Sequence, residues 1–268
     1  MRGNMEALLE VTGLRVWLGQ REIVRGVTLT VPRGATVALV GESGSGKTTL
    51  LRALMGLLPA EATVEGSVRL RGGAGAGSMS LLHGSAQHWR TLRRRYLAWI
   101  PQEPQAALDP RRSAGAHLRE CLGRGAQAGE AARLMHEVGL DPERGRDYPH
   151  QWSGGMQQRL LVAMALARRP RLLLADEPTS ALDTLHQAQL LALLRRVREE
   201  ESLSLLLVTH DLAVAATLAD DVCVMADGAI LEQGPVRDVF AHPRTAEVAR
   251  MVAGQPGNPR RKTAGGAG

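Results

Sequence analysis

The chain has 268 residues, 44% of them hydrophobic, which suits one large domain with a substantial core. No apolar run is long enough to span a bilayer, and the start lacks the apolar core of a signal peptide, so we expect a cytosolic protein. The net charge of +6 permits an anionic membrane partner, but scattered arginines and only 3% aromatic residues disfavour nucleic acid as a partner.

The chain begins with two stretches that are typical of strands, residues 8–16 and 23–31. Trp17 and Gly19 are predicted to make the turn between them, and Pro32 follows the second strand. Trp17 has two interpretations at this point. Its flat side chain could stack on an adenine ring, or it could anchor the turn in the core.

A phosphate-binding motif follows, with the pattern G-x-x-x-x-G-K-[ST]. An apolar run at residues 37–40 precedes it as a predicted buried strand, and residues 49–58 follow with helical spacing. The glycines let backbone N–H groups surround a phosphate, Lys47 supplies a compact charge, and the Thr48 hydroxyl can reach Mg²⁺. The chain contains only two lysines, and one of them stands here. The motif consists of Gly41, Glu42, Ser43, Gly44, Ser45, Gly46, Lys47 and Thr48.

The next segments are predicted as a strand at residues 64–71, a glycine-rich loop at 72–77, a helix at 89–95 and a strand at 96–100. Gln102 follows the last strand between two prolines. It is either a Mg²⁺ ligand that senses a partner or an exposed loop glutamine.

Residues 113–139 have a helical pattern and predict a helical lobe inserted into the nucleotide-binding core. A helix then runs to Arg169 from a capping turn. The exposed N–H groups of that turn either bind a second phosphate or simply cap the helix. The turn contains Ser153, Gly154, Gly155 and Met156.

A buried strand at residues 171–175 ends in two acids. This arrangement is typical of the second half of a phosphate-loop ATPase site, with Asp176 near Mg²⁺ and Glu177 set to polarise a water molecule. A further helix begins after Asp183, which is a natural N-cap. The stretch before this helix consists of Ser180, Ala181, Leu182 and Asp183.

Residues 203–208 predict another buried strand, which places His210 on the rim where the strands of an α/β sheet end. Asp227-Gly228 between two apolar runs predicts a hairpin. Strands that alternate with helices indicate a mostly parallel sheet covered on both faces. The tail at residues 254–268 is expected to be disordered.

Taken together, these motifs resemble the nucleotide-binding subunits of ATP-binding-cassette (ABC) transporters, over about residues 8–253. GESGSGKT matches Walker A, LLLADE Walker B, SALD the D-loop, Gln102 the Q-loop and His210 the switch histidine. WSGGM matches the signature, which is usually LSGGQ, so Trp152 and Met156 depart from the general pattern. The resemblance implies a P-loop NTPase core over residues 6–253, with an antiparallel β subdomain and an α-helical subdomain at about 103–165.

The resemblance also implies the site. ATP would contact Trp17, residues 41–49 including Thr49, and Gln102, while Mg²⁺ would be held by Thr48, Gln102 and Asp176. Glu177 would act as general base, with Lys47 and His210 as the other catalytic residues. Two such domains would pair head to tail, with residues 153–156 of one reaching the ATP of the other. The second ATPase is either a copy of this chain or a homologue in this scheme. A groove at the Q-loop would receive a membrane subunit.

The sequence most resembles ATPases of peptide and nickel importers. This resemblance implies that the chain works at the cytoplasmic face of the inner membrane, with two permeases and a solute-binding protein as its partners. The expected cargo is nickel, another chelated metal, or di- or oligopeptides. The runs Leu58-Pro59-Ala60 and Ala219-Asp220-Asp221-Val222 favour nickel. Many peptide-type members have a C-terminal extension with clustered cysteines, and the lack of one here is expected to weaken the oligopeptide interpretation. The alternative is a non-transport ABC ATPase, such as an accessory subunit of a phosphonate C–P lyase.

Overall fold

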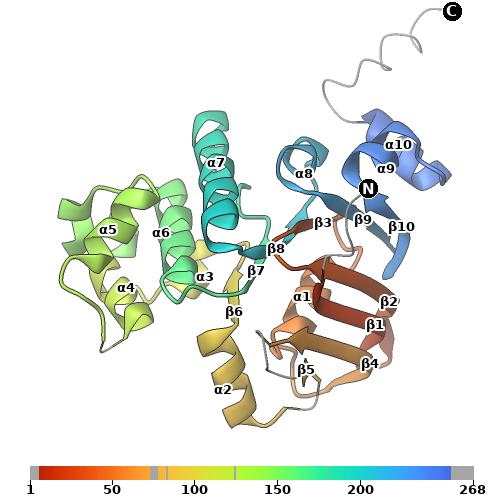
Figure 1. Ribbon diagram of the computed structural model, residues 1–268, viewed down its shortest axis with the longest axis horizontal. Coiled ribbons are helices and arrows are strands. Elements are labelled where there is room, and N and C mark those ends of the chain that lie inside the picture. Colours follow the sequence, from red (N-terminus) through yellow and green to blue (C-terminus); the bar gives the residue numbers. More distant parts are fainter. Residues whose placement is uncertain (1–5, 73–77, 83, 124, 181, 255–268) are drawn as a thin grey trace, which may run out of the picture.

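The computed structural model describes residues 6–72, 78–82, 84–123, 125–180 and 182–254. These residues form two β-sheets and a lobe of helices that projects from one end of the molecule (Figure 1). Residues 73–77 of the expected glycine-rich loop and 255–268 of the expected tail lie outside the described residues. Within the described ranges, no helix combines the length and apolarity that crossing a bilayer requires.

The central sheet has the strand order β10-β9-β3-β8-β7-β6. Its strands are β3 (Thr36–Val40), β6 (Leu97–Ile100), β7 (Leu172–Asp176), β8 (Ser204–Thr209), β9 (Asp221–Ala226) and β10 (Ala229–Pro235). Neighbouring strands are parallel except β9 and β10, which form the hairpin predicted at Asp227-Gly228. Every residue of β3, β7 and β8 is buried, as a parallel sheet covered on both faces requires. The predicted mostly parallel sheet is confirmed.

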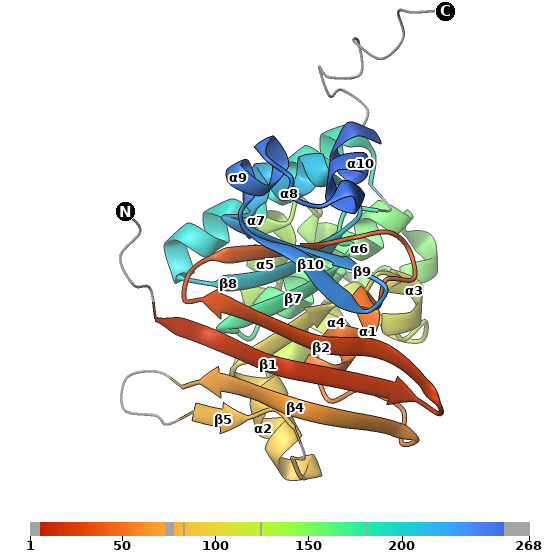
Figure 2. The same ribbon diagram turned by 90° about the vertical axis from the view of Figure 1, so that its right-hand side faces the viewer.

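The second sheet is antiparallel and lies as a separate layer beside the central one (Figure 2). Its order is β2-β1-β4-β5, from β1 (Ala7–Leu18), β2 (Arg21–Pro32), β4 (Ala62–Arg71) and β5 (Ser78–Ser80). Trp17 belongs to β1, where it pairs with Glu22 and Thr63, so its placement in a turn was wrong. The strand continues past it because the turn is tighter than predicted and begins at Gly19, whose φ is +60°.

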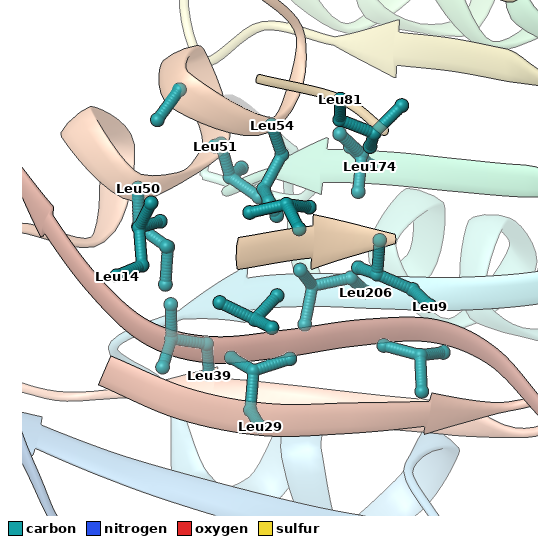
Figure 3. Close-up of a cluster of buried hydrophobic side chains, with 14 of the residues drawn as sticks. Leu9, Leu14, Leu29, Leu39, Leu50, Leu51, Leu54, Leu81, Leu174 and Leu206 are labelled. Carbon is teal, nitrogen blue, oxygen red and sulfur yellow. The ribbon is translucent and has the colours of Figure 1, made fainter. Parts of the chain in front are cut away.

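Helix α1 (Lys47–Leu54) packs between the two sheets (Figure 3). Its leucines 50, 51 and 54 are fully buried. Each buried leucine contributes about 1.5–3 kcal/mol, so this contact fixes the start of the helix relative to both sheets. The leucines around it come from the antiparallel sheet and from β3, β7 and β8, namely Leu9, Leu14, Leu29, Leu39, Leu174 and Leu206.

Two helices end earlier than the sequence pattern predicts. Helix α1 ends at Leu54 because Gly56 adopts φ +61° and the next N–H closes back on the Arg52 carbonyl at 2.8 Å. Helix α6 (Gly154–Leu166) ends before Arg169, which has φ +47° and therefore cannot continue a right-handed helix. In both cases a residue in the left-handed conformation ends the helix, although the apolar spacing of the sequence continues beyond it.

The predicted helical insertion is confirmed between β6 and β7 (Figure 1). Its core is continuous with one face of the central sheet, where Leu160 of α6 is packed in the same cluster as Leu173 of β7. The lobe therefore shares a rigid base with the strands. Its segments are α3 (Pro104–Ala107), α4 (Ala114–Leu122), α5 (Glu130–Glu137), the 3₁₀ turns η1 (Pro142–Arg146) and η2 (Pro149–Gln151), and α6.

The remaining helices cover the sheets, and the last of them is tied to β10. The carboxylate of Glu232 accepts hydrogen bonds from the backbone N–H groups of Arg244 (2.8 Å) and Thr245 (2.5 Å). Val248 is then buried in the cluster that contains Val40, the last residue of β3. These helices are α2 (Ala86–Arg95), α7 (Thr184–Glu201), α8 (Leu212–Leu218), α9 (Val236–Ala241) and α10 (Ala246–Gly254).

Candidate active site

The phosphate loop, residues 41–48, connects the end of β3 to the first turn of α1. Two of its glycines are required by sterics. A Cβ atom at Gly41 would lie 2.1 Å from the Met225 carbonyl oxygen, and one at Gly46 would lie 2.8 Å from the Ile23 carbonyl oxygen. Gly46 also has φ +100°, which side chains disfavour. The neighbouring strands therefore leave no room for a side chain at these two positions of the loop.

Lys47 folds back into this loop. Its Nζ donates to the carbonyl oxygens of Gly41 (2.8 Å) and Glu42 (2.7 Å) and to Ser45 Oγ (3.1 Å). Burial lowers the pKa of Lys47, and the nearby carboxylate of Glu177 opposes that change. The ammonium group thus lies inside the loop. An anion bound there would be attracted by the charge of Lys47 and could accept hydrogen bonds from backbone N–H groups.

Asp176, the last residue of β7, is 1% exposed, and neither carboxylate oxygen has a hydrogen-bond partner of good geometry among the described residues. Burial raises its pKa, while a contact with the Thr48 hydroxyl acts in the opposite direction. Such an orphaned buried carboxylate next to a hydroxyl fits a magnesium ion, which prefers oxygen ligands. Among the described residues, no group of three or more His, Cys, Asp or Glu side chains is arranged to hold a metal ion, so an ion here would depend on these few oxygens, water and phosphate.

Glu177 lies between Gln102 and His210. Its Oε1 is 3.1 Å from His210 Nδ1, and its Oε2 accepts a hydrogen bond from Gln102 Nε2 at 3.2 Å. Gln102, Glu177 and His210 follow the carboxyl ends of β6, β7 and β8, which are neighbours in the sheet. The backbone of Glu177 has φ +46°, a strained conformation for a residue with a side chain. The sheet order therefore brings these three side chains, distant in sequence, into one contact.

The capping turn predicted before α6 is present. Ser153 is the N-cap, and its Oγ accepts a hydrogen bond from the Met156 N–H at 3.3 Å. We call residues 153–155 the signature turn. It lines a cavity of about 460 Å³ together with Leu182 and Asp183 from the stretch before α7.

The stretch before α7 is joined to the acidic pair. Ser180 Oγ donates to the Glu177 carbonyl oxygen at 3.0 Å. Asp183 caps α7 as predicted, because its Oδ1 accepts the His186 N–H at 2.9 Å. Ala181, also expected at this site, lies outside the described residues.

The signature turn and the phosphate loop line different cavities within one chain. Residues 41–45 and His210 line one cavity, of about 680 Å³, and the signature turn lines another, with no described residue in common. Trp17 is separated from the phosphate loop by strand β2. It pairs with Glu22 of that strand, and the carbonyl oxygen of the next residue, Ile23, lies against Gly46 of the loop. Its role as an adenine-stacking residue stays a prediction, as does the contact of Thr49 with ATP.

A groove of about 560 Å³ adjoins the site and was only partly foreseen. Gln102, Thr48 and Asp176 line it on the catalytic side. Its other walls come from the end of α1, from α2, from β6 and from α6 with the residues just after it, and no sequence motif connects these elements. These walls include Arg52, Met55, Arg93, Trp99, Leu161, Met164 and Arg168.

Comparison with known proteins agrees with this geometry. The ABC transporter family matches residues 24–180. The dipeptide transport ATP-binding protein DppD of Lactococcus lactis subsp. cremoris is 38% identical over 253 residues, which cover 89% of this chain and 71% of DppD. The oligopeptide transport ATP-binding protein OppD of Salmonella typhimurium is 40% identical over 248 residues, which cover 88% of this chain and 72% of OppD.

Among solved structures, this chain is similar to the ATP-binding cassette MJ0796, in a dimeric post-hydrolysis state bound to ADP and Pi. The TM-score is 0.74 at 27% identity, and the match covers 85% of this chain and 99% of that one. The family match, the similar proteins and the similar structure all agree with the sheet order, the phosphate loop and the acidic pair at residues 176–177. The chain belongs to the family of ABC transporter ATP-binding proteins.

Proposed function

We propose that this chain binds ATP with Mg²⁺, hydrolyses it and thereby energises an importer of di- or oligopeptides. The observation that carries the proposal is the contact of Glu177 with Gln102 and His210, beside the buried Asp176 and the phosphate loop. The names of DppD and OppD favour peptides over nickel or another chelated metal as the cargo.

The phosphate loop supplies the binding energy for the triphosphate. Lys47 would exchange its present carbonyl partners for β- and γ-phosphate oxygens, which are stronger acceptors for an ammonium group. Thr48, Asp176 and Gln102 are the side chains that would hold Mg²⁺, which would neutralise charge on the same phosphate oxygens. Ring stacking by Trp17 would add affinity that does not depend on the phosphates.

Glu177 is the candidate general base. Its carboxylate is fixed at two oxygens and only 17% exposed, so it can orient a water molecule in line with the γ-phosphate and take its proton. His210 holds that carboxylate and would also donate to the γ-phosphate. Because the signature turn faces a separate cavity, we assign it to the ATP of a second ABC ATPase in a head-to-tail dimer.

The groove beside Gln102 is the proposed contact for a permease. It combines apolar walls with arginines and shares Gln102, Thr48 and Asp176 with the catalytic side. A segment seated there would touch the residues that hold Glu177 and the ion, which provides a physical route from hydrolysis to the membrane subunits. In this proposal the chain would lie at the cytoplasmic face of the membrane, and two permeases and a solute-binding protein would be its partners.

The test is reconstitution of the chain with its candidate permeases, solute-binding protein and second ATPase in proteoliposomes. ATP-dependent uptake of a labelled dipeptide, absent with the Glu177→Gln variant, would support the proposal. Uptake of Ni²⁺ alone would replace the peptide cargo with nickel. Capture of a soluble multi-subunit enzyme, with no binding to any permease, would favour the lyase accessory subunit instead.

A further inference from the structure

Arg144, in the 3₁₀ turn η1, contacts four residues that flank the signature turn. Its Nε donates to Asp147 Oδ2 at 2.7 Å, and its Nη2 donates to the Gln151 carbonyl oxygen at 3.3 Å. Its Nη1 lies 3.6 Å from the sulfur of Met156, and its guanidinium carbon lies 5.8 Å from the ring centroid of Trp152. One planar side chain therefore connects residues on both sides of the turn.

Trp152 completes the cluster. Its ring is 6% exposed, and its indole Nε1–H donates to the same Asp147 oxygen at 3.2 Å. Hydrogen bonds from Arg144 and then from Trp152 lower the pKa of Asp147, so the carboxylate stays charged over the physiological range. The tryptophan that departs from the usual signature thus has a defined partner.

The cluster holds the turn at both ends. Trp152 directly precedes Ser153, and the Met156 N–H donates a hydrogen bond to the Ser153 hydroxyl. A shift of either neighbour would move the Ser153 hydroxyl and the exposed N–H groups of the helix start. A planar guanidinium that makes directional bonds to a carboxylate and a carbonyl restricts such shifts more than a flexible ammonium would.

We infer that Arg144 is a positioning residue that, with Asp147 and Trp152, holds the signature turn in the orientation that contacts the triphosphate of the partner subunit. The inference rests on the proposed function, because it requires the head-to-tail dimer. It adds a residue that none of the family motifs contains. Arg144 acts through the turn and does not itself touch the nucleotide.

The test uses the full chain with the Glu177→Gln substitution, in which ATP should hold the dimer together. The dissociation constant of the ATP-bound dimer is measured by sedimentation velocity, and the ATP affinity of the monomer by a fluorescent ATP analogue. Arg144→Gln should raise the dimer dissociation constant about tenfold or more, the effect of losing one charge-assisted hydrogen bond. Monomer ATP affinity should change less than about twofold, because the phosphate loop is untouched.

Two further variants separate positioning from general stability. Trp152→Phe keeps a buried ring but loses the bond to Asp147, and should weaken the dimer less than Arg144→Gln does. Arg144→Lys keeps the charge without the planar fork and should recover only part of the loss. The matched control is Arg133→Gln, which removes another arginine of the lobe. Arg133 is exposed and is paired at 3.0 Å with Glu137 of its own helix α5, so its loss should leave the dimer unchanged.

The outcomes distinguish the two claims. If the parent variant forms no dimer with ATP, either alone or when mixed with its candidate second ATPase, the proposed function fails and this inference fails with it. If the parent dimerises, and both Arg144→Gln and Trp152→Phe dimerise as tightly as the parent, only the inference is overturned. Full recovery by Arg144→Lys would also overturn it, since charge alone would then suffice.

Discussion

The Glu177 carboxylate lies 3.1 Å from Nδ1 of His210, and these two residues follow the ends of neighbouring parallel strands. The contact is possible because β7 and β8 end at the same edge of the sheet. Gln102, which follows β6, donates a hydrogen bond to the same carboxylate. Glu177 is thus oriented by side chains of this chain, which limits the reorganisation required for proton abstraction.

Replacing Glu177 with glutamine should abolish turnover while ATP binding is kept. The amide preserves shape and hydrogen bonding but cannot accept the proton, so hydrolysis should fall by about 100-fold or more. Phosphate release measures turnover, and size-exclusion chromatography with ATP should show a trapped dimer. Glu199→Gln, at an exposed position on α7, is the control with unchanged activity. Undiminished hydrolysis by Glu177→Gln would refute the assignment of the base.

Lys47 should not be replaceable by arginine. Its Nζ fits among two carbonyls and a hydroxyl within 3.1 Å, where a planar guanidinium has no room. Both Lys47→Ala and Lys47→Arg should therefore lose about tenfold or more in ATP affinity, measured by isothermal titration calorimetry. Wild-type affinity in either variant would contradict the proposed site.

Asp176→Asn should stabilise the nucleotide-free protein while it removes Mg²⁺-dependent hydrolysis. Burial raises the pKa of Asp176 and outweighs the attraction of Lys47, so the charged form destabilises the fold. The unfolding free energy at neutral pH, measured in urea titrations, should therefore be higher in Asp176→Asn than in the wild type. A lower stability of the variant would show that the carboxylate has a stabilising partner.

The same residue predicts a pH dependence. The carboxyl holds its proton to a higher pH in the folded state than in the unfolded state, where the pKa is near 3.8. Its contribution to stability therefore falls as pH rises from about 3.8 through the raised folded value. Urea midpoints of wild type and Asp176→Asn should converge toward the acid end of this window. Parallel midpoints at every pH would contradict this prediction.

Trp17→Ala should weaken ATP binding by roughly 5- to 100-fold, the usual value of one base-aromatic stack. Trp17→Phe should retain most of the affinity. Binding of inorganic tripolyphosphate, which has no base to stack, should be equal in wild type and both variants. An equal loss of ATP and tripolyphosphate affinity in Trp17→Ala would instead show that Trp17 supports the loop structurally.

The local features could be predicted from sequence. The phosphate loop is encoded by glycines and one lysine between a buried strand and a helix, and Asp176 and Glu177 directly follow an apolar run. Helix caps such as Ser153 and Asp183 are likewise short-range signals. Each depends on bonds or hydrogen bonds within a few residues, so the chain itself contains the necessary information.

Other features required the fold. The position of Trp17 depends on its pairing with Thr63, and the Arg144 cluster depends on contacts of η1 with the residues around the signature turn. The contact of Gln102, Glu177 and His210 depends on the order of β6, β7 and β8. That order is set by burial of many side chains that are distant in sequence, a collective energy that no short pattern of residues records.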